Sequence, residues 1–186
     1  SDKTLYLDVL ANYQEVSDKT IANYLNVLKK LYIIEEIPAW SPNIRSKTSI
    51  RLAPKKSFVD PSLAVATLGI TPEELMKDPK TYGLLFENLV NRDLSVYANA
   101  IGGKLSHYRD RYGLECDNVI HFDNGKYALV EVKLGGAKIK EAESHLIRLQ
   151  ELISSNENLS NPEFMMIITG TDMAYTLPSG VLVVPI

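Results

Sequence analysis

The fold is decided by two segments, Gly113-Leu114-Glu115-Cys116-Asp117 and Ala128-Leu129-Val130-Glu131-Val132-Lys133. Asp123-Asn124-Gly125 lies between them, and Asn-Gly is a strong signal for a tight hairpin turn, since both residues tolerate a left-handed backbone. We therefore expect two adjacent antiparallel strands over residues 114–122 and 126–133.

The length of this turn determines whether the acidic residues of the two strands can meet. A shift of one residue moves every side chain of a strand to the other face. A two-residue turn at 124–125 would pair Asp117 with Val132 and turn Glu131 away. A three-residue loop at 123–125, with its glycine left-handed in a bulge, pairs Asp117 with Glu131 and brings their β-carbons within about 5 Å. In that register one face carries four charged residues: Glu115, Asp117, Glu131 and Lys133.

Two carboxylates side by side in an apolar sheet repel each other and lose solvation. A hard cation such as Mg²⁺ or Mn²⁺ relieves both effects and is held by carboxylates and water. Lys133 would point at the same place, where it could orient or deprotonate a water or stabilise charge on a phosphate. Two acids and a lysine on adjacent strands therefore indicate a phosphodiester-hydrolysis site at Asp117, Glu131 and Lys133.

A simpler explanation is that Glu131 and Lys133 form the solvated face of an edge strand, where alternating charges are common. The apolar residues Val130 and Val132 on the opposite face, together with the matching Asp117, favour the metal site instead.

The flanking sequence predicts the order helix, three strands, helix, strand. Apolar residues recur at helical spacing within 83–98 and 138–153, and β-prone runs lie between and after these helices. The expected strands are 104–110, 114–122, 126–133, 164–169 and 181–186.

In this order the motifs resemble the PD-(D/E)XK nuclease superfamily: Gly83-Leu84-Leu85-Phe86-Glu87, Tyr108-Arg109-Asp110 and the two segments quoted first. More narrowly, they resemble the C-terminal domain that follows AAA-type P-loop ATPase domains in many bacterial and archaeal proteins. The resemblance implies an α/β fold with a restriction-nuclease-like αβββαβ core, a Mg²⁺ (or Mn²⁺) cofactor and an ATPase domain upstream. It also implies catalytic residues at Glu87, Asp117, Glu131 and Lys133, of which the three acids are metal ligands and Lys133 is the catalytic lysine. Cys116 stands where the family usually has proline.

Residues 1–70 are expected to form a winged helix-turn-helix that precedes the nuclease-like domain of residues 71–186. Ser17 is a plausible helix cap, and two β-prone runs after the helix would form a two-stranded ribbon with a basic tip that includes Lys55 and Lys56. Such a unit suggests DNA contact, with a protein-contact or spacer role as the alternative. The candidate DNA-binding residues are Lys19, Lys29, Arg45, Lys47 and Arg51.

The amino-acid composition limits the functions and cellular locations that fit this chain. The net charge of −3 gives no global attraction to nucleic acid, so DNA binding would need a local basic patch. A single cysteine and the lack of a long apolar run suit a cytoplasmic location without membrane contact. Gly102-Gly103-Lys104 lacks the glycine spacing of a phosphate-binding loop, so ATP binding is expected only in an upstream part.

The chain starts within an apparent helix, which also suggests a piece of a longer protein. Two functions remain: a metal-dependent nuclease domain, or a catalytically idle DNA- or protein-binding regulatory module of the ATPase.

Overall fold

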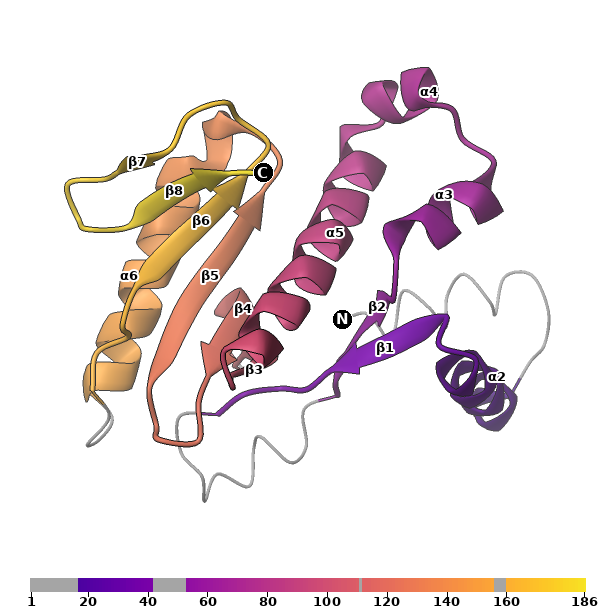
Figure 1. Ribbon diagram of the computed structural model, residues 1–186, viewed down its shortest axis with the longest axis horizontal. Coiled ribbons are helices and arrows are strands. Elements are labelled where there is room, and N and C mark those ends of the chain that lie inside the picture. Colours follow the sequence, from indigo (N-terminus) through magenta and orange to yellow (C-terminus); the bar gives the residue numbers. More distant parts are fainter. Residues whose placement is uncertain (1–16, 42–52, 111, 156–159) are drawn as a thin grey trace.

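The computed structural model describes residues 17–41, 53–110, 112–155 and 160–186, and the larger of its two sheets is mixed and has six strands (Figure 1). The strand order is β3-β4-β5-β6-β8-β7, antiparallel from β3 to β5, parallel from β5 to β8, and antiparallel again at β7. The strands are β3 (Lys104–Arg109), β4 (Glu115–His121), β5 (Tyr127–Lys133), β6 (Met165–Thr169), β7 (Tyr175–Thr176) and β8 (Leu182–Pro185).

Helices cover both faces of this sheet. Helix α6 (Ile139–Ser155), entered through the short 3₁₀ helix η2 (Gly136–Lys138), makes the crossover that the parallel pair β5–β6 requires. Its Leu146 and Leu149 are fully buried against the sheet. Helix α5 (Pro79–Ala100) packs a second apolar cluster on the opposite face through Val90 and Leu94. The predicted order of helix, three strands, helix and strand is therefore present, as α5, β3, β4, β5, α6 and β6.

The hairpin between β4 and β5 has the three-residue loop. Gly125 has a φ of 84°, and its N–H donates to the Phe122 carbonyl at 3.1 Å. Asn118 pairs with Val130, and the same register continues along both strands to the loop. The two-residue alternative is thus wrong. The β3–β4 register shifts nearby, because Ser106 pairs with Val119 and Tyr108 with Cys116. This bulge lies at Asp117 and Asn118.

The N-terminal elements begin and end where local signals predict. Ser17 caps α2 (Asp18–Lys30) by accepting from the Thr20 N–H, and Thr71 forms a capping box at α4 (Pro72–Lys77). Helix α3 (Pro61–Leu68) ends at Gly69, whose φ is 62°. Strands β1 (Ile34–Ile37) and β2 (Lys55–Phe58) form the expected antiparallel ribbon.

Several expectations change in detail. Lys55 and Lys56 lie within β2, not at a ribbon tip. Helix α5 starts four residues earlier than predicted, because Asp78 accepts from the Thr81 N–H and Pro79 occupies its first turn. The short β7 was not anticipated. Arg45, Lys47 and Arg51 fall outside the described residues, as does the apparent helix at the start of the chain, so the winged-helix arrangement stays a prediction.

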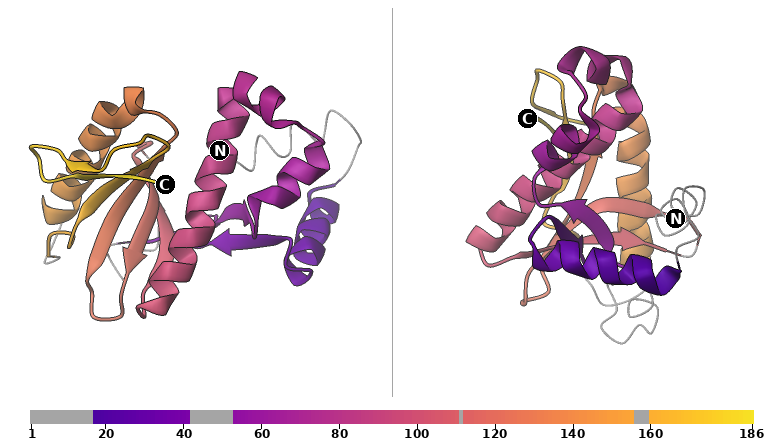
Figure 2. Two further views of the ribbon diagram at one scale, coloured as in Figure 1. Left: turned by 45° about the horizontal axis from the view of Figure 1, so that its top comes forward. Right: turned by 90° about the vertical axis from the view of Figure 1, so that its right-hand side faces the viewer.

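The N-terminal elements and the sheet lie on opposite sides of α5, as Figure 2 shows. The segment after β1 also runs along β3: the His107 N–H donates to the Pro38 carbonyl at 2.9 Å, and the Trp40 N–H donates to the His107 carbonyl at 2.7 Å. Trp40 then packs on Tyr127, with ring centroids 5.0 Å apart. These bonds cover backbone groups at the sheet edge. None of the helices described is long and apolar enough to cross a bilayer.

Candidate active site

Asp117, Glu131 and Lys133 form a carboxylate–lysine cluster at the end of the β4–β5 pair. The Lys133 Nζ lies 2.5 Å from Glu131 Oε2 and 3.3 Å from Asp117 Oδ2. The same Asp117 oxygen accepts the Val132 backbone N–H at 2.9 Å, which fixes the carboxylate against β5. The register of the three-residue hairpin loop brings the two acids together, as the sequence predicts.

Burial controls the charge state of this cluster. The Glu131 side chain is only 4% exposed, and this desolvation, with the nearby charge of Asp117, raises the pKa of Glu131 to about 8. Burial also disfavours the ionised form of Asp117, but the positive charges of Lys133 and Lys55 and the Val132 N–H together lower its pKa. Burial works against a charged lysine as well, yet the two carboxylates raise the pKa of Lys133. At neutral pH Glu131 is therefore protonated, whereas Asp117 is ionised beside a charged lysine.

The fourth predicted residue, Glu87, lies on α5 and forms an ion pair with Lys55 of β2. Both side chains are about three-quarters buried, at 23% and 25% exposed. Lys55 is also near enough to Asp117 for its charge to lower the pKa of that carboxyl. The structure thus connects Glu87 to the cluster through Lys55, and not by a direct carboxylate contact. Glu115 lies apart, paired with Arg109 at 3.0 Å.

The donor chemistry of the cluster fits a divalent cation, since Asp117 and Glu131 provide the oxygen ligands that Mg²⁺ prefers. A cation there would offset the cost of burying Glu131 beside a second acid. No group of three or more His, Cys, Asp or Glu within the described part of the chain is spaced to hold a metal. A cation between the two acids also requires Lys133 to turn away from Glu131. Two carboxylates and water would then be its ligands.

Of the proposed DNA-binding residues, the structure describes two, and both lie on α2. Lys19 is exposed, while Lys29 forms an ion pair with Glu36 of β1. The pairing reduces the positive charge that this helix offers to a phosphate backbone.

Comparisons with known proteins divide the chain into two matched segments. Residues 82–186, more than half of the chain, match the model of a domain of unknown function, DUF4143. The chain belongs to the DUF4143 family. Residues 1–74 match a second model, a domain of unknown function named DUF8612. None of the curated proteins matches the chain.

One similar solved structure is a half-complex from a tetradecameric assembly of Thermococcus gammatolerans McrB AAA+ hexamers with bound McrC. The TM-score is 0.36 at 14% identity, over 56% of this chain and 27% of that one. This chain thus spans about a quarter of the length of the protein it matches.

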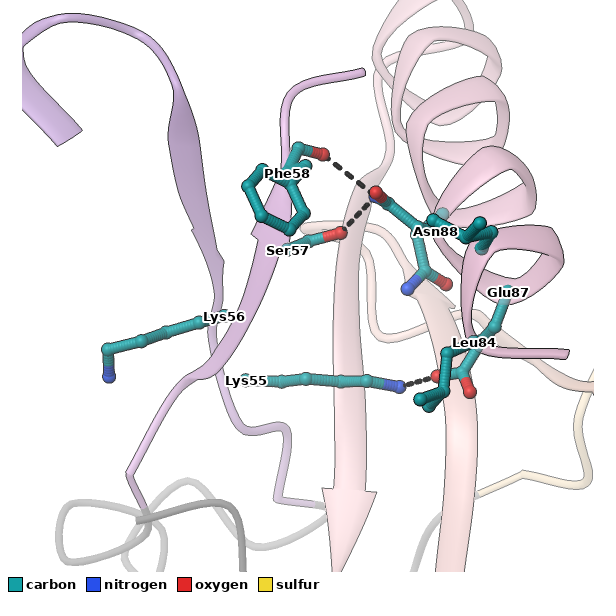
Figure 3. A pocket seen from close by; sticks show the side chains of 9 residues that line it. Lys55, Lys56, Ser57, Phe58, Leu84, Glu87 and Asn88 are labelled. Atoms are coloured by element: carbon teal, nitrogen blue, oxygen red, sulfur yellow. Dashed lines mark hydrogen bonds and ion pairs between the residues drawn. The ribbon is translucent and has the colours of Figure 1, made fainter. Parts of the chain in front are cut away.

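The four predicted catalytic residues all lie in the DUF4143 segment, but Lys55 lies in the segment that matches DUF8612. A pocket of about 200 Å³ between β2 and α5 contains the Lys55–Glu87 pair (Figure 3). Asn88 closes it by donating to Ser57 Oγ at 2.6 Å and to the Phe58 carbonyl at 2.8 Å.

Sequence reasoning missed this role of Lys55 and placed it on the ribbon tip. Its contact with Glu87 joins residues 32 positions apart in the chain. A lysine in a β-prone run gives no local sign of such a partner.

Proposed function

We propose that this DUF4143 member hydrolyses phosphodiester bonds of nucleic acid in a reaction that depends on Mg²⁺ or Mn²⁺. The observation that carries the proposal is the convergence of two carboxylates, one of them almost fully buried, on a single lysine. Burial of an acid pair destabilises the folded state. A fold retains such a pair more readily when the pair binds a ligand. The order of helices and strands around the pair, and the resemblance of its motifs to PD-(D/E)XK nucleases, support this proposal.

Each residue has a distinct part in the proposed reaction. Asp117 and Glu131 hold the cation, which when bound lowers the pKa of a coordinated water and neutralises charge on the phosphate. Lys133 lies within contact of both acids, so its ammonium group would stabilise negative charge on a phosphate bound there. Glu87 contributes a third acid beside Lys55.

A binding module without catalysis is the second candidate, and specific contacts favour it. The ammonium group of Lys133 already bridges Asp117 and Glu131, and Lys55 already neutralises Glu87. With these ion pairs intact, the cluster is stable without a metal. It would then serve as a structural centre for a domain that binds DNA or protein.

The narrower resemblance adds a proposal about context: the chain is the C-terminal part of an AAA-type ATPase whose ATP-binding domain lies upstream. The sequence printed here contains no phosphate-binding loop, so in this proposal its partner domain supplies the nucleotide chemistry.

A cleavage assay tests the proposed activity. Single-stranded, duplex and branched DNA and RNA would be incubated with Mg²⁺ and with Mn²⁺. Glu131→Gln should weaken Mn²⁺ binding and abolish cleavage together, whereas Lys133→Ala should keep metal binding and lose cleavage. Glu115→Gln is the matched control, since it removes an exposed acid outside the cluster. Absence of cleavage on every substrate, with Asp117→Asn leaving DNA or partner binding intact, would favour the binding module.

A further inference from the structure

The carboxylate–lysine cluster has a second cation nearby that comes from outside the DUF4143 segment. Lys55 extends from β2 toward Glu87, while the neighbouring Lys56 points away from it (Figure 3). The Lys55 side chain is one-quarter exposed, so it borders solvent as well as the pocket. Its charge acts on Asp117, which places it within electrostatic reach of the cluster.

The backbone that carries Lys55 is fixed against α5. Ser57 is buried, and its hydroxyl accepts from the Asn88 amide, which also donates to the Phe58 carbonyl. On the next turn of α5, Asn91 accepts from Asn118 at 2.8 Å, one residue beyond Asp117. Buried amides of α5 thus hold β2 on one side and β4 on the other. A lysine that only faces solvent does not need a fixed backbone, because its long side chain moves freely in water.

The charges around the cluster leave a place for an anion. Three carboxylates, Glu87, Asp117 and Glu131, face two lysines, so the fully ionised group has one net negative charge. A divalent cation turns this into one net positive charge, which a phosphodiester neutralises. Without Lys55 the cation-loaded group would be neutral, and the cation-free group would carry one further negative charge. In either state the group would attract a phosphate less strongly.

We propose that Lys55 binds a phosphate of the nucleic-acid substrate beside the carboxylate–lysine cluster, so that the site is shared between the DUF8612 and DUF4143 segments. The inference rests on the proposed function for the identity of its ligand. It makes Lys55 a binding residue and gives the N-terminal ribbon a part in substrate recognition.

The test compares Lys55→Ala and Lys55→Gln with Lys56→Ala in the full chain, using two probes whose charges are opposite. Mn²⁺ alone is titrated by calorimetry, and a short fluorescein-labelled oligonucleotide is titrated by anisotropy in EDTA. Loss of Lys55 should tighten Mn²⁺ binding by up to about tenfold, since a nearby positive charge is removed. It should weaken oligonucleotide binding several-fold and lower the salt dependence by about one phosphate contact. Lys56→Ala should leave Mn²⁺ binding unchanged.

Opposite changes for cation and oligonucleotide support the proposal, since loss of a structural support would weaken both. The proposal is overturned by equal weakening of both probes, by tighter oligonucleotide binding, by no change, or by a wild-type chain that does not bind the oligonucleotide. Failure of the nuclease proposal is visible separately, as an absence of Mn²⁺ binding and cleavage in the wild type. The oligonucleotide measurement in EDTA still tests Lys55 in that case.

Discussion

Replacing Glu131 by glutamine should make the protein more stable at alkaline pH, because the folded state holds this carboxyl in its protonated form. Burial first, and then the charge of Asp117, raises the pKa of Glu131 from the usual 4.5 to about 8. At a pH between these two pKa values, the folded protein therefore keeps a proton on Glu131 that the unfolded chain releases. Stability is complete below the unfolded pKa and falls as the pH rises toward about 8.

The size of the effect follows from the two pKa values. At 1.36 kcal/mol for each pKa unit, ionised Glu131 costs at most about 5 kcal/mol. Structural relaxation and water around the ionised group reduce this cost, so we expect roughly 2–5 kcal/mol. Asp117, whose lowered pKa acts in the opposite direction, titrates only at acid pH and leaves this window unchanged.

Urea denaturation in EDTA at pH 5, 7 and 9 measures the effect. Glutamine mimics the protonated acid, so Glu131→Gln and wild type should be about equally stable near pH 5 and should diverge as pH rises. Other titrating groups are common to both proteins and cancel in the difference. Glu115→Gln, which removes an exposed acid, should show no such divergence. An equal difference between Glu131→Gln and wild type at pH 5 and pH 9 would falsify the reasoning.

Three further outcomes can be measured on the same chain. Gly125→Ala should lower the free energy of unfolding by about 1 kcal/mol, because the φ of 84° at this position disfavours a residue with a β-carbon. The control is Gly135→Ala, which should lower the free energy of unfolding by less, because Gly135 has a φ of −138° and equally open surroundings. Equal costs for the two would contradict this. Asn88→Ala should lower the free energy of unfolding, measured in urea, by about 1–3 kcal/mol, because it leaves the Phe58 carbonyl without its amide donor. An unchanged free energy of unfolding would show that water replaces the amide. Calorimetry should detect no tight ATP binding, since the printed sequence has no phosphate-binding loop, and stoichiometric micromolar binding would refute that expectation.

Most of the helices and strands, and the meeting of the two acids, could be predicted from the amino-acid sequence alone. Helix starts at Ser17 and Thr71 and the stop at Gly69 follow from hydrogen bonds and backbone angles within a few residues. The hairpin loop is equally local, because the left-handed Gly125 sets the register that brings Asp117 to Glu131. Short-range rules of this kind need no knowledge of the rest of the molecule.

The surroundings of the two acids depend instead on how distant segments of the chain pack together. The position of Lys55 depends on how β2 packs against α5, and the bulge at Asp117 depends on where β3 pairs with β4. The raised pKa of Glu131 likewise comes from burial by segments distant in sequence. Desolvation and long-range ion pairs are set by the packing of the whole chain, so the residues involved carry no local pattern that reveals them.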